Sequence, residues 1–344
     1  MNLRLFIRPV LALLLTPCVS GQRIYGAGSE PACAATNVLG SGSTAACEKA
    51  DANALPGRTE VLREIAKYEA AARRAESAHE TNAVVATVYM RLASLYEDAG
   101  MHDQSEAAIE RSISLLRRNA EWSGQLAEGL SLLGLLHGEM GKLRLAEKEE
   151  LEALRLRESL GNSFEIARSW NSLAGLYLID HKYTLARDFA RRAMDEFLVS
   201  KQPDVGDRIS SRFNLAMALC YTKDYPSAIP LLKDGIDIAK AAFQPNDFPI
   251  GIGEFLLGFV YWKSGNLSDA GQYMEQGTAI MKGQLGWGHP TYLHALRQYA
   301  LFLRTSKRVE DASAVEREIR LAEAVVDVHS IQMPKDASGL AGLR

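Results

Sequence analysis

The chain has 344 residues, of which 47% are hydrophobic and 24% are charged, and its formal net charge is −3. This balance is typical of a folded protein and excludes an intrinsically disordered chain. Lys and Arg do not gather into a stripe, so the electrostatic footprint of nucleic-acid binding is absent and no nucleic-acid partner is expected. The length suits either two ordinary domains or one array of repeats.

The first 21 residues, MNLRLFIRPVLALLLTPCVSG, have the pattern of a secretory signal peptide. Arg4 and Arg8 make a basic start, an apolar run extends to Leu15, and small residues follow. The run is shorter than the roughly 20 apolar residues that a membrane-spanning helix needs. We therefore expect this segment to be removed and the protein to be exported to the periplasm or the extracellular space.

Cys18 leaves a second interpretation of the same segment open. The letters LTPC loosely resemble a bacterial lipobox, whose cysteine is lipidated, but Pro17 stands where that signal usually has a small residue. We expect Cys18 to be lost with the signal peptide. The alternative is a lipid-anchored bacterial envelope assembly factor, and contact with a membrane is expected only if Cys18 is lipidated.

Residues 22–57 are rich in Gly, Ser, Ala and Pro and show no hydrophobic period, which predicts a flexible linker. Cys33 and Cys47 lie in this segment and are able to form a disulfide if the chain is exported. Cys220 falls inside a helical pattern, and we expect it to be reduced and shielded. Residues 58–80 have a helical apolar face and are predicted to cap the N-terminal end of the array that follows.

The body of the chain repeats itself with a period of about 42 residues. Each unit has a small residue, a mostly aromatic or Leu position three residues later, a turn residue seven later and a second small residue twelve later. The first small residues, spaced by 41, 40, 42, 42 and 42 positions, are Ala93, Gly134, Ala174, Ala216, Gly258 and Ala300. The turn residues are Gly100, Gly141, His181, Lys223, Gly265 and Lys307.

This pattern predicts a helix hairpin in every unit. The two small residues let the helices approach closely, and a glycine at the turn supplies the left-handed conformation that ends a helix. One hairpin cannot bury its apolar faces alone, so neighbouring hairpins must stack. We therefore predict an all-α fold, a right-handed α-solenoid of about six antiparallel hairpins over residues 81–329, followed by a disordered tail over residues 330–344.

These units resemble tetratricopeptide repeats, and their longer period resembles the repeats of kinesin light chains. In that subfamily a G-P-D-H-P turn precedes the first helix of a repeat, and GWGHP at Gly286 to Pro290 is similar to it. Pro290 is expected at the first position of a helix, where its fixed φ is favourable. His289 is then a residue of the turn before a helix rather than a catalytic or metal-binding group.

No catalytic motif is visible elsewhere in the chain. The histidines show no H-E-x-x-H spacing, and neither a G-x-S-x-G elbow nor a C-x-x-C pair occurs. We expect a non-enzymatic scaffold without a metal or another cofactor, whose partner is a protein or a peptide. The remaining alternative is a hydrolase whose site is assembled only in three dimensions.

The resemblance implies that the first helices line a concave groove. Groove positions counted from the small residues then include Asn171, Phe213, Asn214, Met217, Tyr221, Phe255, Phe259, Trp262, Arg297 and Arg304. Phe213, Phe255 and Trp262 are expected to form one exposed apolar patch. The arginines flank this patch, which suits a peptide with an apolar anchor and an acid group. The alternative is that the aromatic residues pack between adjacent first helices.

The resemblance also allows a comparison with the carboxylate clamp of some family members, which uses Lys and Asn at set places. Asn171 and Asn214 fit this set loosely, and no matching pair of lysines is present. A receptor for chaperone tails is therefore not expected.

Overall fold

The computed structural model describes residues 56–200, 204–286 and 289–331, and every regular element in these ranges is a helix. The predicted signal peptide, almost all of the linker and the tail lie outside the described residues. The helices are α3 Pro56–Ser77, α4 Asn82–Asp98, α5 His102–Leu116, α6 Ser123–Glu139, α7 Leu143–Leu160, α8 Ser163–Ile179, α9 Tyr183–Val199, α10 Val205–Tyr221, α11 Tyr225–Ala242, α12 Phe248–Ser264, α13 Leu267–Leu285, α14 Pro290–Thr305 and α15 Val309–Ile331. A short 3₁₀ helix, Ala120–Trp122, precedes α6.

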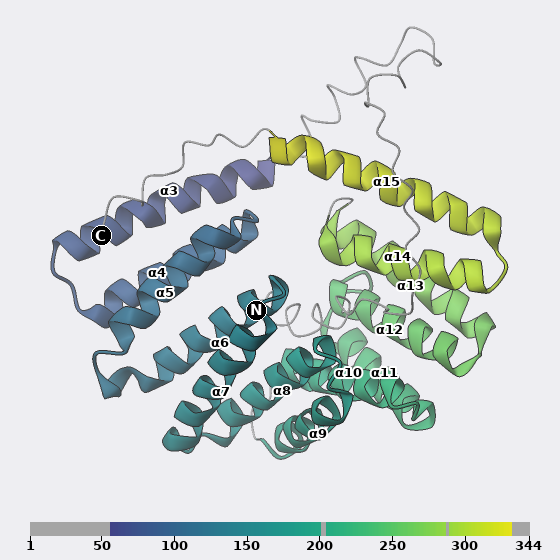
Figure 1. The fold of residues 1–344 in the computed structure, drawn as a ribbon, viewed down its shortest axis with the longest axis horizontal. Coiled ribbons are helices and arrows are strands. Elements are labelled where there is room, and N and C mark those ends of the chain that lie inside the picture. Colours follow the sequence, from purple (N-terminus) through teal and green to yellow (C-terminus); the bar gives the residue numbers. More distant parts are fainter. Residues whose placement is uncertain (1–55, 201–203, 287–288, 332–344) are drawn as a thin grey trace, which may run out of the picture. The chain divides into compact units, whose positions relative to one another are not determined.

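The described residues form two compact units, one ending at Leu136 and one beginning at His137. In the first unit α3 packs on α4, and α4 packs on α5 (Figure 1). The Tyr96 hydroxyl of α4 donates a hydrogen bond of 2.7 Å to the Glu69 carboxylate of α3. The segment predicted as a capping helix over 58–80 is thus a helix that contacts the first hairpin.

The second unit consists of successive helix hairpins. The first helices α8, α10 and α12 contact one another, and each second helix packs against the first helix of the next hairpin, α9 on α10 and α11 on α12 (Figure 1). The prediction of an all-α solenoid is confirmed. None of the helices in the described ranges is long and apolar enough to cross a membrane.

The predicted turn positions are the points where the backbone turns left-handed. All six have φ between 56° and 91°, including the three that are not glycine: His181, Lys223 and Lys307. A non-glycine residue rarely adopts this conformation. The need for a sharp helix end at a fixed place in each hairpin therefore prevails over the local preference of the residue.

The predicted small residues hold the two helices of each hairpin together. All six second small residues are fully buried: Ser105, Ala146, Ala186, Ala228, Ala270 and Ala312. On α12, a Cβ added to Gly258 would lie 2.6 Å from the Met274 nitrogen and 3.0 Å from the Ala270 carbonyl oxygen of α13. The helices are therefore in backbone contact at this point, which only glycine permits.

A third small position, nineteen residues after the first, was not predicted from the sequence. It holds Ser112, Ala153, Ala193, Gly235 and Gly277, all of which are buried. A Cβ on Gly277 would lie 2.5 Å from the Phe255 nitrogen, so α12 and α13 touch at two points along their length.

His289 marks the beginning of α14, as predicted. It is the N-cap residue, and its Nδ1 accepts a hydrogen bond of 3.2 Å from the Thr291 backbone N–H. Pro290 follows at the first helical position. A neutral imidazole thus satisfies one of the free N–H groups of the helix end.

Candidate functional site

Phe213 and Phe255 do not form an exposed patch, so that prediction is wrong. Phe213 is 0% exposed and Phe255 is 1% exposed. Ring atoms of Phe213 lie 2.5 Å and 2.7 Å from the positions that a Cβ would take on Gly235 of α11 and Gly253 of α12. Phe213 therefore fills the space between α10, α11 and α12.

The physical reason lies in helix periodicity. Phe213 and Phe255 each stand three residues before a small residue that faces the second helix, and residues three apart share a helix face. They are therefore directed towards the second helix and away from a groove. Met217 is also buried, at 1% exposed.

Asn171 and Asn214 are buried and hydrogen-bond to each other. Asn214 Nδ2 donates to Asn171 Oδ1 at 2.9 Å, and Asn171 Nδ2 donates to Ser210 Oγ at 2.9 Å. These hydrogen bonds join α8 to α10. The side-chain amides of both asparagines therefore bond within the protein. The Asn214 Oδ1 atom is buried and accepts no hydrogen bond from the described residues.

An ion pair lies one helical turn before these hydrogen bonds. Arg168 Nε on α8 is 3.8 Å from Asp207 Oδ1 on α10. Burial raises the pKa of Asp207 to about 6, although the Arg168 cation acts in the opposite direction. The contact between α8 and α10 is thus polar at these residues.

The other predicted aromatic residues form a continuous line of rings, here called the aromatic row. Tyr183 stacks on Tyr221 at 4.5 Å between ring centroids, and Tyr221 lies 6.2 Å from Phe259. Phe259 lies 5.8 Å from Trp262, which lies 5.9 Å from Phe302. The row crosses from α9 over α10 and α12 to α14.

The aromatic row is partly accessible and has a cation at its rim. Tyr183, Tyr221 and Trp262 are half-buried, whereas Phe259 and Phe302 are buried beneath them. The Lys263 ammonium lies 4.1 Å from the Trp262 ring centroid and 5.0 Å from that of Phe259. Tyr183 and Phe302 were not predicted, because neither stands at a groove position counted from the small residues.

Arg297 and Arg304 are exposed, and both are ion-paired with the last helix. Arg297 Nη2 lies 2.5 Å from Glu323 Oε1, and Arg304 Nε lies 2.5 Å from Glu316 Oε1. Their role beside the aromatic floor stays a prediction. Their guanidinium groups already have carboxylate partners on α15.

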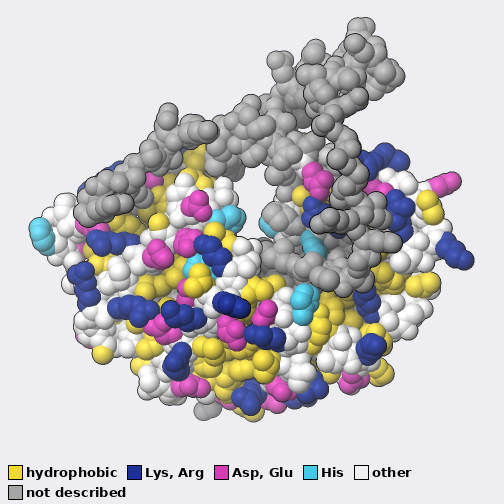
Figure 2. All heavy atoms as spheres, in the orientation of Figure 1, with side chains coloured by type: hydrophobic (Ala, Val, Ile, Leu, Met, Phe, Trp, Pro, Cys, Tyr) yellow, Lys and Arg dark blue, Asp and Glu magenta, His cyan; other side chains and the backbone are white. Residues whose placement is uncertain are grey.

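The part of the chain that the structure describes contains no group of three or more His, Cys, Asp or Glu residues arranged to hold a metal ion. Cys220 is a free, buried thiol, as predicted, and burial raises its pKa to about 12. A thiol of this kind is protonated at neutral pH and is a poor nucleophile. On the face that Figure 2 shows, charged side chains of both signs are mixed.

Comparisons with known proteins agree with this architecture. Residues 86–117 and 165–241 match family profiles of the tetratricopeptide repeat. A search of the curated proteins found no match. The chain is a tetratricopeptide-repeat protein, as its repeat pattern predicts.

Several solved structures share the fold. The apo form of RapI has a TM-score of 0.66 and 15% identity, over 78% of this chain and 94% of that one. BtubC (BKLC) from P. vanneervenii has a TM-score of 0.54 and 18% identity, over 66% of this chain and 93% of that one. A Rap protein complexed with competence and sporulation factor has a TM-score of 0.53 and 14% identity, over 77% of each chain. At such identities the similarity concerns the fold alone.

Proposed function

We propose that this protein is a non-enzymatic scaffold that binds a segment of a partner protein, or a peptide, along the aromatic row. The observation that carries this proposal is the row itself. Rings from four helices contact one another in one line, and Tyr183, Tyr221 and Trp262 are its half-buried, accessible members. Accessible clusters of large apolar side chains on soluble proteins mark interaction sites more often than they mark structure.

The chemistry of the row indicates what it binds. Trp and Tyr contribute large contact areas at a low entropic cost and are the commonest residues at binding hot spots. The Lys263 ammonium above the Trp262 ring adds a positive charge at the rim. The class of partner also agrees with one structural relative, whose crystal structure is a complex of a Rap protein with competence and sporulation factor.

Selection of a random peptide library on the intact protein provides the test. We expect Trp262→Ala to weaken binding of the recovered peptides by about thirtyfold, or roughly 2 kcal/mol, while the thermal unfolding temperature changes little. Leu198→Ala on α9, where the side chain is 57% exposed and outside the row, is the matched control. Equal affinities of the wild type and Trp262→Ala for the recovered peptides would contradict the proposal that the aromatic row binds them.

We also propose that the protein is exported. The support is the sequence of the first 21 residues, which lies outside the described part of the chain. Mass analysis of the protein purified from its own cells tests it: a chain that begins close to Gly21 agrees with signal cleavage. A diacylated Cys18 at the N-terminus indicates the lipid-anchored alternative, and a chain that retains Met1 contradicts export.

A further inference from the structure

A pocket of about 550 Å³ opens between the first half of α13 and the end of α14. It is lined by Leu267, Ser268, Gly271, Gln272, Glu275, Phe302, Ser306 and Arg308. Phe302 is also the last ring of the aromatic row, so the pocket and the row share this buried side chain. The Ser306 Oγ atom is buried and has no hydrogen-bond partner among the described residues.

The equivalent place between the second and third hairpins is filled. Glu147 on α7 stands thirteen residues after its small residue, and Lys182 stands eight residues after the next one. The Glu147 carboxylate accepts a hydrogen bond of 3.1 Å from Lys182 Nζ and another of 2.9 Å from the Tyr177 hydroxyl. A carboxylate from one hairpin thus binds a cation of the next.

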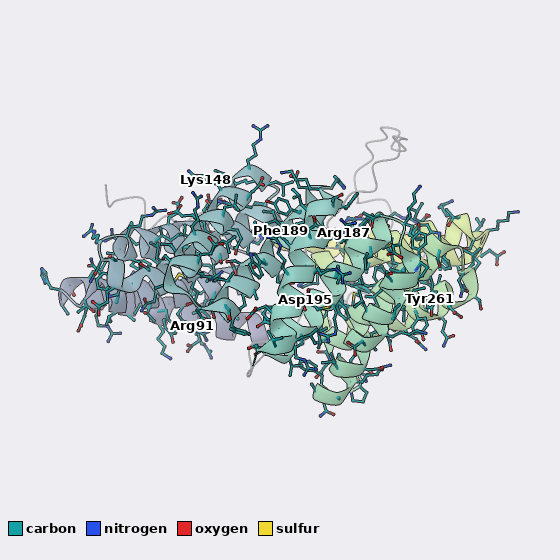
Figure 3. All side chains as sticks on the ribbon, turned by 90° about the horizontal axis from the view of Figure 1, so that it is seen from below. Arg91, Lys148, Arg187, Phe189, Asp195 and Tyr261 are labelled. Atoms are coloured by element: carbon teal, nitrogen blue, oxygen red, sulfur yellow. The ribbon has the colours of Figure 1, made fainter. Side chains whose placement is uncertain are left out.

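The other pairs of neighbouring hairpins have different residues at these two positions, thirteen residues after one small residue and eight after the next. Between the third and fourth hairpins the positions hold Arg187, labelled in Figure 3, and Asp224, so the charges are exchanged, although Arg187 binds its neighbour Asp188 at 3.1 Å. Between the fourth and fifth hairpins the positions hold Ile229 and the uncharged Asn266. Between the fifth and sixth, Arg308 stands opposite Gly271, and its carboxylate partner is instead Asp311, three residues later in its own hairpin.

The missing side chain at Gly271 is the reason that the pocket exists. A Cβ on Gly271 would lie 3.5 Å from both Arg308 Nη1 and a ring carbon of Phe302. Arg308 Nε binds Asp311 at 2.7 Å, which leaves its Nη1 directed to the place where a Glu at position 271 would extend. The pocket therefore has a guanidinium edge over an aromatic floor.

We propose that this pocket, here called the Gly271 pocket, binds one carboxylate of a peptide together with the apolar side chain next to it. The ligand supplies the acid group that Glu147 supplies in the earlier hairpin. Guanidinium groups bind carboxylates in a planar, charge-assisted geometry, and Phe302 and Leu267 offer the apolar contact.

Glu275 restricts the choice of ligand. It stands one turn beyond Gly271 on the same side of α13, and it is exposed. A second acid group on the ligand would meet this carboxylate and be repelled. The pocket thus favours a single acid group held at the Arg308 end.

This inference extends the proposed function, because the Gly271 pocket and the aromatic row share the Phe302 ring. The two proposals are nevertheless separable. Short probes that fill only the pocket test this inference, whereas the long selected peptides test the row. If Trp262→Ala leaves the affinity for those peptides unchanged, the proposal for the aromatic row is contradicted. The proposal for the Gly271 pocket is then still tested by the short probes.

The test is NMR titration of the isotope-labelled full-length protein with acetyl-Phe-Glu-amide and acetyl-Phe-Gln-amide. A third probe, acetyl-Gly-Phe with a free terminal carboxylate, distinguishes a terminal acid group from a side-chain one. We expect the amide signals of Gly271 and Arg308 to move with at least one acidic probe. The affinity for acetyl-Phe-Gln-amide should be at least about tenfold lower than the affinity for that acidic probe.

Three variants sharpen the titration. Arg308→Gln should remove the preference for the acid group, whereas Lys307→Gln, the same charge change one residue earlier, should keep it. Gly271→Glu should pair with Arg308 inside the protein and abolish probe binding without lowering the thermal unfolding temperature. Equal binding of the Glu and Gln probes, no shift with any probe, or unchanged binding to Gly271→Glu would each overturn the proposal.

Discussion

The fifth and sixth hairpins have the same design but are held together by different forces. In α12–α13 the backbones touch, since a Cβ on Gly258 or Gly277 would lie within 2.6 Å of backbone atoms of the opposite helix. In α14–α15 the contacts include ion pairs between long side chains at the surface, such as Arg304 with Glu316. Every residue of α12 from Phe248 to Tyr261 is buried, whereas α14 exposes Arg297, Leu301 and Arg304.

This difference teaches where stability and recognition lie. Close packing in a dry interior gives many dispersion contacts and is sensitive to one methyl group. Exposed ion pairs contribute little, because water screens them and the side chains lose entropy when they pair. We therefore expect α12–α13 to carry much of the stability of the second unit and the edge of α14 to remain available for binding.

The largest effect is expected for Phe255→Ala on α12. This change removes a buried ring and should destabilise the protein by about 3–5 kcal/mol, measured as the midpoint shift in urea unfolding. Leu301→Ala on α14, where the side chain is 38% exposed, should cost less than about 1 kcal/mol. Similar costs for the two variants would contradict the comparison between the hairpins.

Two glycine substitutions should act in opposite directions. Gly258→Ala places a methyl group 2.6 Å from the Met274 nitrogen and should cost about 1–3 kcal/mol, seen locally as faster amide exchange in α12 and α13. Gly271→Ala meets nothing closer than 3.5 Å and should stabilise α13 by about 0.5–1 kcal/mol. A destabilising Gly271→Ala would show that the Gly271 pocket is already filled.

Acid should destabilise α14 through its histidines. Burial, together with the neighbouring Arg297 cation, lowers the pKa of His294 to about 4, and burial also lowers the pKa of His289. The unfolded chain therefore binds the proton more readily, so the stabilisation is complete above the unfolded pKa of about 6.5 and is lost as the pH falls towards 4.

The size of this loss should be on the order of 2 kcal/mol for His294. Urea unfolding at pH 7 and pH 4.5 measures it in the wild type, in His294→Gln and in His102→Asn, which changes an exposed histidine of α5 as the control. The pH dependence should shrink only in His294→Gln. An undiminished dependence would place the titrating group elsewhere.

The smallest effect is expected for Arg304→Gln. The ion pair with Glu316 is solvent-exposed, so the unfolding temperature should fall by no more than about 2 °C at low salt. At 0.5 M NaCl the difference from the wild type should vanish, because salt screens such pairs. A large, salt-independent loss would mean that α15 is attached mainly through this contact.

The sequence by itself determined the repeat, the all-α hairpins and the places where each helix ends. These features depend on neighbours within one hairpin, so a fixed spacing such as Gly258 to Ala270 is enough to reveal them. The spacing even located Lys223 and Lys307 as turn residues, and the structure shows that both are left-handed, against their own preference. His289 was recognisable as the start of α14 because a cap and a proline act locally.

Only the tertiary structure decided which aromatic residues are core and which are surface. Phe213 and Trp262 look alike in the sequence pattern, but the former is wedged against glycines of two neighbouring helices while the latter is half-buried in the aromatic row. Spacing within a repeat places Phe213 on the helix face of the small residue Ala216, but how far the next hairpin covers that face depends on how the hairpins stack. The same holds for Arg308, since its Nη1 lies beside Gly271 only because the two hairpins stack.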